Sequence, residues 1–197
     1  MKYTIVPIAL LLFGMGGCAL NPSPPMQTYT LTPATVKPVT YSPYRQRVVK
    51  VSFPQSIKEP LSDKIPFSYS VGDRGYYLNS SWANNIGQLL QGVLMESLEQ
   101  SRLFKAVLPY ASTATEDLRL ECMVYDISHH LRNGESYALF SVGVALVDAH
   151  SGKLLRLKRF SYKEKTPTVD AKGYVTALHR ALARFENALV AWLAMGD

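Results

Sequence analysis

The chain has 197 residues, of which 47% are hydrophobic, and it contains two cysteines and carries a formal net charge of +6. A chain of this size buries enough apolar surface to fold as one domain without disulfide staples. Residues 1–58 contain six basic and no acidic residues, whereas residues 59–197 contain 15 of each. Nucleic-acid-binding domains carry a basic face on the folded body, so this distribution argues against that class. The N-terminal excess fits either a solvated linker or a segment that favours an anionic membrane surface.

Residues 1–17 have the layout of a secretory signal peptide, with an early lysine, an apolar run and two glycines directly before Cys18. A cysteine at this place is typical of bacterial lipoprotein signals, which are removed so that the cysteine becomes the acylated N-terminus. A transmembrane helix is the alternative, but the stretch 3–20 is shorter than the roughly 20 residues that a span needs, and Pro7 and three glycines interrupt it. Ala19 stands where an aspartate would retain similar Gram-negative lipoproteins, which favours export to the outer membrane.

Residues 18–44 are interpreted as the lipidated cysteine followed by a Pro-rich tether. Six prolines lie between Asn21 and Pro43, together with many serines and threonines. Prolines at this density keep a chain extended and semi-rigid, so the segment can space a domain from a bilayer. Within it, residues 29–34 alternate in the manner of a short edge strand. The folded domain is therefore expected at 45–197.

The first half of this domain is predicted to contain strands, a hairpin and one helix. The predicted elements are a strand at 47–53, a loop at 55–66, a hairpin with strands 67–71 and 75–78, a helix from Ser80 or Ser81 to Arg102, and a strand at 104–108. The helix is predicted because apolar residues between Trp82 and Leu98 fall on one face at helical spacing.

The second half is predicted to be a three-stranded meander and a terminal helix. Its elements are strands at 118–127, 137–147 and 153–163 and a helix at 169–194, with Asp170 as its N-cap. Asn133-Gly134 predicts a tight hairpin turn between the first two strands. The complete order predicts an α/β fold in which a mixed β-sheet is covered by two main helices.

Sequence motifs of the common enzyme classes are missing. The sequence has no G-x-S-x-G, no phosphate-binding G-x-x-x-x-G-K-[ST] and no G-x-G-x-x-G. His129 and His130 would point to opposite faces of a strand, so we expect exposed histidines rather than a metal site. Glu116 and Asp117 are expected to be solvated, and Cys122 is expected to be a buried small hydrophobe. We therefore predict no catalytic residue, no metal ligand and no cofactor.

Aromatic and basic residues supply the candidate contact surfaces. The chain contains 12 tyrosines. The candidate partner interface consists of Phe67, Tyr69, Tyr76, Tyr77 and Trp82. Such a surface would meet another subunit or an acyl chain; packing within the domain is the alternative. The basic residues between Lys153 and Lys165 predict a solvated edge strand protected by charge, with an acidic partner or a lipid headgroup as the alternative.

Several of these features together resemble the ABC-type transport auxiliary lipoprotein family, which includes PqiC-like proteins. The resemblance is carried by the signal ending at Cys18, Tyr29-Thr30-Leu31-Thr32-Pro33-Ala34, the strand Val48-Val49-Lys50-Val51, Tyr76-Tyr77 and Trp82, the helix end at 98–104, the strands at 118–147 and the terminal helix. It covers nearly all of the mature chain, and the Tyr-x-Leu-x-Pro-Ala segment is its most specific motif. The sequence departs from the family through its tyrosines at 67–77 and through Gly87 and Gly92.

The resemblance implies a non-enzymatic outer-membrane lipoprotein, held on the periplasmic side by palmitate and other acyl chains at Cys18. It implies an accessory role in an ABC transport system of the Mce type, which supports lipid transport and membrane integrity. The implied partners are an Mce-type substrate-binding protein and ABC transporter subunits, with no nucleic acid. A ring-shaped homo-oligomer that docks a periplasmic lipid conduit is also implied. The alternatives are a structural or assembly lipoprotein of another envelope machine, such as a pilot or activator, and a periplasmic enzyme with an unfamiliar site.

Overall fold

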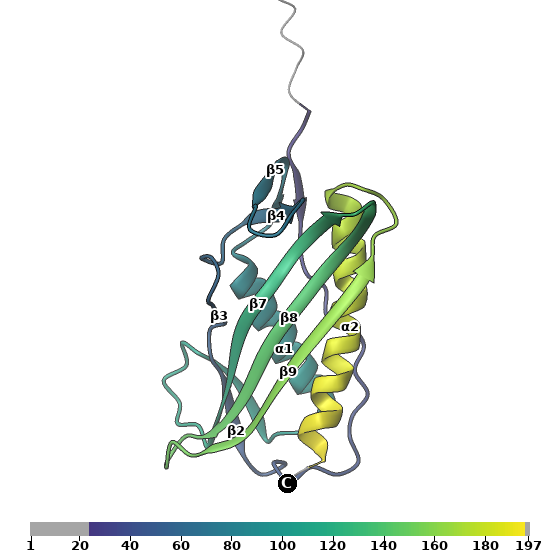
Figure 1. The fold of residues 1–197 in the computed structure, drawn as a ribbon. Coiled ribbons are helices and arrows are strands. Elements are labelled where there is room, and N and C mark those ends of the chain that lie inside the picture. Colours follow the sequence, from purple (N-terminus) through teal and green to yellow (C-terminus); the bar gives the residue numbers. More distant parts are fainter. Residues whose placement is uncertain (1–23, 196–197) are drawn as a thin grey trace, which may run out of the picture.

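The computed structural model describes residues 24–195, so the predicted signal peptide and Cys18 lie outside the described residues. Figure 1 shows a sheet lying over two helices. In chain order the elements are β1 (Gln27–Tyr29), β2 (Val48–Val51), β3 (Gln55–Ser56), β4 (Lys64–Ser68), β5 (Gly75–Trp82), α1 (Ile86–Ser101), β6 (Ala106–Pro109), β7 (Leu118–Arg132), β8 (Glu135–Asp148), β9 (Leu154–Lys165) and α2 (Ala171–Ala194).

Strand β7 organises the sheet. One of its edges pairs along its whole length with antiparallel β8, which in turn pairs with antiparallel β9. The other edge is shared by three short parallel strands, with β2 near its start, β3 in its middle and β4 near its end. The outer strands are β6 beside β2, β5 beside β4 and β1 beside β5. The described residues thus form one mixed nine-stranded sheet.

Both helices lie on the same face of this sheet (Figure 1). Helix α2 packs on β8 and β9, α1 packs on β2 and β6, and the two helices contact each other. Their apolar residues recur every three or four positions, as a helix that covers a sheet requires. The buried stripes comprise Ile86, Leu90, Val93, Leu94 and Leu98 of α1 and Tyr174, Leu178, Leu182, Phe185 and Leu189 of α2. Within residues 24–195, no helix combines the length and the apolar character that a membrane span requires.

The described part of the Pro-rich segment lies against the helix layer. Leu31 and Val36 are buried in the core. The backbone N–H of Ala34 donates to Glu186 Oε2 at 2.9 Å, and that of Val36 donates to Gln100 Oε1 at 2.9 Å. Side chains of both helices thus satisfy the backbone of a segment that has no strand partner there. The expected tether at 18–44 is therefore not a free spacer throughout, since folded structure begins before residue 45.

The predicted α/β class, a mixed sheet covered by two helices, is confirmed. The start of the first helix differs from the prediction: the helix begins at Ile86 rather than near Ser80. The reason is that β5 continues to Trp82, where it pairs with β1 and donates its last backbone N–H to Asp63 O at 2.7 Å. The N-cap is therefore Asn85 rather than Ser80 or Ser81, and its side chain accepts from the backbone N–H of Gly87. Asp170 caps α2 as predicted.

Two turns show how local chemistry sets the strand ends. Asn133 and Gly134 have φ values of 53° and 74°, which is the backbone geometry predicted for the β7–β8 hairpin. In the β4–β5 hairpin, Asp73 Oδ1 accepts from the backbone N–H groups of Tyr69 and Ser70 at 2.9 and 3.0 Å. This turn ends β4 at Ser68. The strand expected at 67–71 therefore begins and ends three residues earlier, at Lys64 and Ser68.

Candidate functional site

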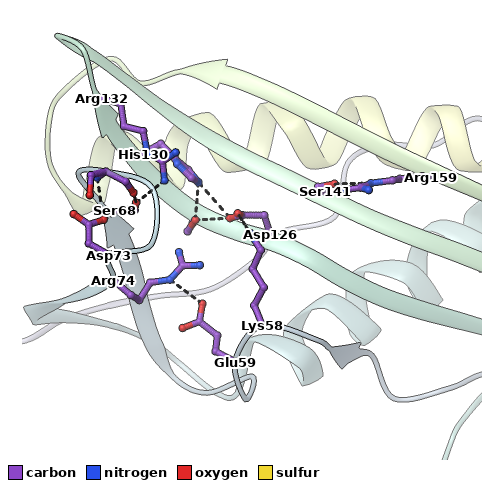
Figure 2. Close-up of polar contacts among 12 residues, drawn as sticks. Lys58, Glu59, Ser68, Asp73, Arg74, Asp126, His130, Arg132, Ser141 and Arg159 are labelled. Carbon is purple, nitrogen blue, oxygen red and sulfur yellow. Dashed lines mark hydrogen bonds and ion pairs between the residues drawn. The ribbon is translucent and has the colours of Figure 1, made fainter.

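The face of the sheet opposite the helices, called the open face below, carries a buried polar cluster at β7. Asp126, Ser128 and His130 project from this face at alternate positions, beyond a bulge at residue 125. Lys58, from the segment between β3 and β4, reaches across the strand so that its Nζ lies 2.6 Å from Asp126 Oδ2 (Figure 2). Ser128 Oγ donates to Asp126 Oδ1 and lies 3.0 Å from His130 Nε2. The cluster therefore joins β7 to the loop that covers it.

Hydrogen bonds determine the charge state of Asp126. Burial alone would raise the pKa of this carboxyl, but hydrogen bonds from His130, Lys58 and Ser128 outweigh burial and hold the pKa well below its usual range. The group is therefore ionised at neutral pH. Its negative charge is compensated mainly by Lys58, whose side chain is half exposed.

The geometry of this Asp–Ser–His cluster differs from that of a hydrolytic triad. In a triad, the carboxylate holds one ring nitrogen of the histidine and the nucleophile contacts the other. Here both Ser128 Oγ and Asp126 Oδ1 approach the same Nε2, at 3.0 and 3.4 Å. The Nδ1 atom of His130 is buried without a hydrogen-bond partner among the described residues. This arrangement joins the strand to its covering loop, and it differs from the geometry by which a triad activates its nucleophile.

His129 lies on the opposite face of β7 and takes part in a separate network. Tyr77 Oη lies 2.6 Å from His129 Nδ1, and Ser136 Oγ lies 2.8 Å from Nε2. The imidazole stacks on Tyr174 of α2 with a centroid distance of 5.5 Å. Burial, assisted by the neighbouring His130, lowers the pKa of His129 to about 4, and burial raises the pKa of Tyr77 to about 12. Both groups are therefore neutral at physiological pH.

The two histidines correct the sequence-based expectation. They do point to opposite faces, but His129 is 0% exposed and His130 is 4% exposed, so neither is a surface histidine. The loops on the open face and α2 on the other face bury them. Within residues 24–195, no three His, Cys, Asp or Glu side chains gather closely enough to hold a metal ion. Cys122 is a buried free cysteine, and burial raises the pKa of its thiol to about 12, as expected for an inert small hydrophobe.

A groove of about 650 Å³ occupies the other half of the open face, near the start of β7. Its lining residues include Phe53, Tyr110, Met123, Tyr125, Ala145 and Leu157. Phe53 and Tyr110 form an edge-to-face pair at 5.7 Å, and the Arg159 guanidinium lies 4.1 Å from the ring centroid of Tyr125. Gly143 allows the Tyr125 ring to lie close to β8, because a Cβ there would stand 3.0 Å from Cε2 of that ring. The result is an apolar hollow with aromatic walls.

Charged residues border this groove at the entry to β7. Glu116 accepts from Lys50 Nζ at 2.6 Å and from Arg119 at 2.8 Å. These hydrogen bonds lower the pKa of Glu116 to about 2. The glutamate is 10% exposed at its side chain, so the expectation that it is freely solvated is wrong. The groove thus combines apolar walls with a rim on which Glu116 is paired with Lys50 and Arg119. This combination is suited to binding a partner.

The residues of the predicted aromatic interface differ in exposure. Trp82 is 2% exposed and packs edge-to-face on Tyr174 in the core. Phe67 and Tyr77 are half-buried and contact each other at 5.1 Å. Tyr69 and Tyr76 are exposed, and Tyr76 donates to Glu59 at 2.8 Å. Phe67, Tyr69 and Tyr77 border one hollow on the surface. The contact role therefore stays a prediction for the four residues other than Trp82, which belongs to the core.

Sequence reasoning missed the groove. Its residues come from the segment after β2, the loop after β6, and β7, β8 and β9. No short motif connects them, because they meet only through strand register. The alternation of Glu121, Met123 and Tyr125 opposite Leu120, Cys122 and Val124 was the available signal, since it gives β7 one large, mixed outer face.

Sequence comparison with known families gives a match over most of the folded domain. Residues 29–190 match the family described as the ABC-type transport auxiliary lipoprotein component. The chain belongs to this family. The matched region begins at the last residue of β1 and ends within α2, so it includes all the elements between them. The family's description makes the protein a lipoprotein of an ABC-type transport system. No curated protein matches the chain in sequence.

Solved structures share the fold. Protein XCC0632 from Xanthomonas campestris superposes with a TM-score of 0.76 at 16% identity, covering 86% of this chain and 95% of its own. An uncharacterised protein gives a TM-score of 0.66 at 16% identity, covering 86% of this chain and 99% of its own. The hypothetical protein CT253 from Chlamydia trachomatis gives 0.50 at 10% identity, covering 77% and 99%. At these identities the similarity shows the fold alone.

Proposed function

We propose that this protein is a non-enzymatic outer-membrane lipoprotein, anchored through acylated Cys18 on the periplasmic side, that serves an ABC transport system of the Mce type in lipid transport. The observation that carries the proposal is the family match across residues 29–190. It is supported by the lipoprotein signal that ends at Cys18. In this role the domain, as a homo-oligomer, docks or supports a periplasmic lipid conduit.

The non-enzymatic role is supported by the geometry of the polar cluster on β7. A catalytic group must reach substrate, but Ser128 and His130 are 0% and 4% exposed. Ser128 Oγ donates to Asp126 Oδ1, and His130 Nδ1 has no hydrogen-bond partner among the described residues that would orient the ring as a triad requires. The cluster is best explained by the need to satisfy polar groups beneath the loop that contains Lys58.

We assign the partner contact to the groove on the open face. The described chain begins at the end of the molecule where β5 and the N-terminus of α2 lie (Figure 1). The groove lies near the start of β7, whereas β4 and β5 lie beside the end of that strand. An anchor preceding β1 would therefore leave the groove turned away from the membrane. That is the side on which a transport conduit crossing the periplasm would approach. The occupant that we propose is the Mce-type substrate-binding subunit of the transporter.

The test is capture of the acylated full-length protein from gently solubilised envelopes, followed by identification of its partners by mass spectrometry. Recovery of an Mce-type subunit or an ABC permease is the expected result. Leu157→Glu places a charge on the groove wall and should reduce recovery at least tenfold. Leu154→Glu is the matched control, because Leu154 is exposed on the same strand but does not line the groove.

The alternative is a structural or assembly lipoprotein, such as a pilot or activator of another envelope machine. It predicts recovery of secretion subunits or peptidoglycan synthases with no transport component, and that result would overturn the proposal. Light scattering on the purified acylated protein tests the homo-oligomer separately. A monomer at all concentrations would remove the ring from the proposal while leaving the transporter contact open to the capture experiment.

A further inference from the structure

Exposed apolar side chains gather at the end of the molecule opposite the groove. Two loops meet there, the β4–β5 loop at 69–74 and the β9–α2 loop at 166–170. The parallel pairing of Ser68 with His130 brings the first loop level with the end of β7. The exposed residues are Tyr69, Val71 and Val169 of these loops and Leu78 of the adjoining strand β5, and we call this set the apolar tip. Val71 is 90% exposed and Leu78 is 87% exposed, which is unusual for ordered apolar side chains.

The β4–β5 loop holds its part of the apolar tip in a fixed conformation. Asp73 Oδ1 accepts from the Tyr69 and Ser70 backbone and from Ser68 Oγ at 2.8 Å. Ser68 Oγ also accepts from Arg132 at 2.7 Å, which fastens the loop to the end of β7 (Figure 2). Gly72 supplies the positive φ of 88° that this turn needs. The loop thus keeps Tyr69 and Val71 outside the domain rather than letting them fold back onto it.

The chain enters the domain at this same end. β1 runs parallel to β5 with Gln27 opposite Ser80, and the described chain begins at the end of the molecule where β5 lies (Figure 1). Fully extended, at about 3.3–3.6 Å per residue, the stretch from Cys18 to Pro24 spans roughly 20 Å. An acyl anchor at Cys18 would therefore hold the apolar tip close to the bilayer surface.

Basic residues flank the apolar tip. Lys163 and Lys165 line a hollow of about 450 Å³ together with Val169, and Lys172 lies in the first turn of α2. The nearby acids are engaged as well. Glu135 lines the same hollow and pairs with Lys163 at 2.6 Å, so Lys165 and Lys172 supply the remaining positive charge. Asp73 closes the β4–β5 loop, and Asp170 caps α2. Apolar and aromatic side chains beside lysines are the composition of protein surfaces that sit at a membrane interface.

We propose that the apolar tip docks on the phospholipid surface, with Tyr69, Val71, Leu78 and Val169 inserted among the headgroups of the leaflet that holds the anchor. This inference rests on the proposed acylation of Cys18. The contact adds a second attachment to the acyl chains, and it fixes the orientation of the domain. With the tip on the membrane, the groove points into the periplasm.

The test uses a nitroxide label at Val71→Cys in the mature acylated protein, reconstituted into phosphatidylethanolamine–phosphatidylglycerol vesicles. Cys122 is buried, so the new thiol is the reactive one. Leu157→Cys, labelled in the groove, is the matched control because Leu157 is also exposed, at 66%. Electron paramagnetic resonance power saturation then compares collisions with oxygen, which concentrates in lipid, and with a water-soluble nickel chelate. We expect oxygen collisions to predominate at residue 71 and nickel collisions at residue 157.

The outcomes separate this inference from the proposed function. Mass spectrometry first establishes whether Cys18 is acylated, and an unmodified cysteine would overturn both proposals together. With the acyl chains present, equal exposure of both labels to nickel would overturn the membrane contact and leave the anchor intact. A label at residue 71 that becomes shielded only when the transporter subunits are added would assign the apolar tip to a protein partner instead.

Discussion

The two faces of the sheet use the same strands for different purposes. On the helix-covered face, β7 contributes Leu118, Leu120, Cys122 and Val124 to a continuous apolar core. On the open face, the intervening residues are charged, aromatic or flexible side chains that line the groove. The residues of the covered face must therefore be apolar to form the core, whereas those of the open face need not be. The groove is thus built from side chains that the apolar core does not use.

Polar burial differs between the two faces as well. On the open face, Asp126 is paired with a cation, and hydrogen bonds keep it ionised. On the covered face, Glu186 is fully buried between the helices, and within residues 24–195 its hydrogen-bond donors are the Ser97 hydroxyl and the Ala34 backbone N–H. Burial raises the pKa of Glu186, and these hydrogen bonds oppose the rise. Protons should thus affect the two faces in opposite directions.

The largest effect should come from breaking the covered face at Phe185. Its ring packs edge-to-face on Phe140 at 5.2 Å and on Phe160 at 5.3 Å, so it joins α2 to β8 and β9. Phe185→Ala should lower the free energy of unfolding by about 3–5 kcal/mol, because it removes buried area and leaves a cavity. Urea denaturation of the purified protein measures this. A loss below about 1 kcal/mol would mean that α2 is not the cover of the core.

Removing the Asp126 carboxylate on the open face should lower the free energy of unfolding by less than Phe185→Ala does. Asp126→Ala leaves Ser128 and His130 without their acceptor, and it should destabilise by about 1–3 kcal/mol. The pKa of Asp126 is lower in the folded state than in the unfolded chain, so its contribution is present above about pH 4 and fades as the pH falls further. The difference in unfolding free energy between wild type and Asp126→Ala should therefore shrink below about pH 4. A constant difference across that range would contradict the ionised assignment.

Glu186 should show the opposite pH dependence. Its raised pKa means that the folded state binds a proton more tightly than the unfolded chain does. Folding therefore favours the protonated form. As the pH falls from neutral toward 4.5, the ordinary pKa of a glutamate, the unfolding free energy of the wild type should rise relative to that of Glu186→Gln. Gln keeps an acceptor for Ser97 and Ala34 without the buried charge. Parallel stability curves for the two proteins would contradict the burial argument.

The contrast between the faces also explains what the sequence could predict. The class, the helices and the three long strands follow from apolar periodicity and turn residues, and Asn133-Gly134 and Asp170 lie where local chemistry placed them. Apolar residues recur regularly along the strands and helices of the covered face because they all pack into one continuous core. The histidines were misjudged because their burial comes from loops and from Tyr174, which are distant in sequence. The groove depends on the strand register that brings five segments together. The apolar pattern within one segment does not show which residues of the other segments lie beside it.

The smallest expected effect on stability belongs to the groove wall. Leu157 is exposed on the open face of β9, and the strand beneath it is held by β8 and by α2. Leu157→Ala should change the free energy of unfolding by less than about 0.5 kcal/mol, since little buried area is lost. The same variant should nonetheless weaken capture of the transporter subunit, because the groove loses part of its apolar wall. A stability loss comparable to that of Phe185→Ala would show that the open face supports the fold as strongly as the covered face, and the separation of fold from contact surface would then fail.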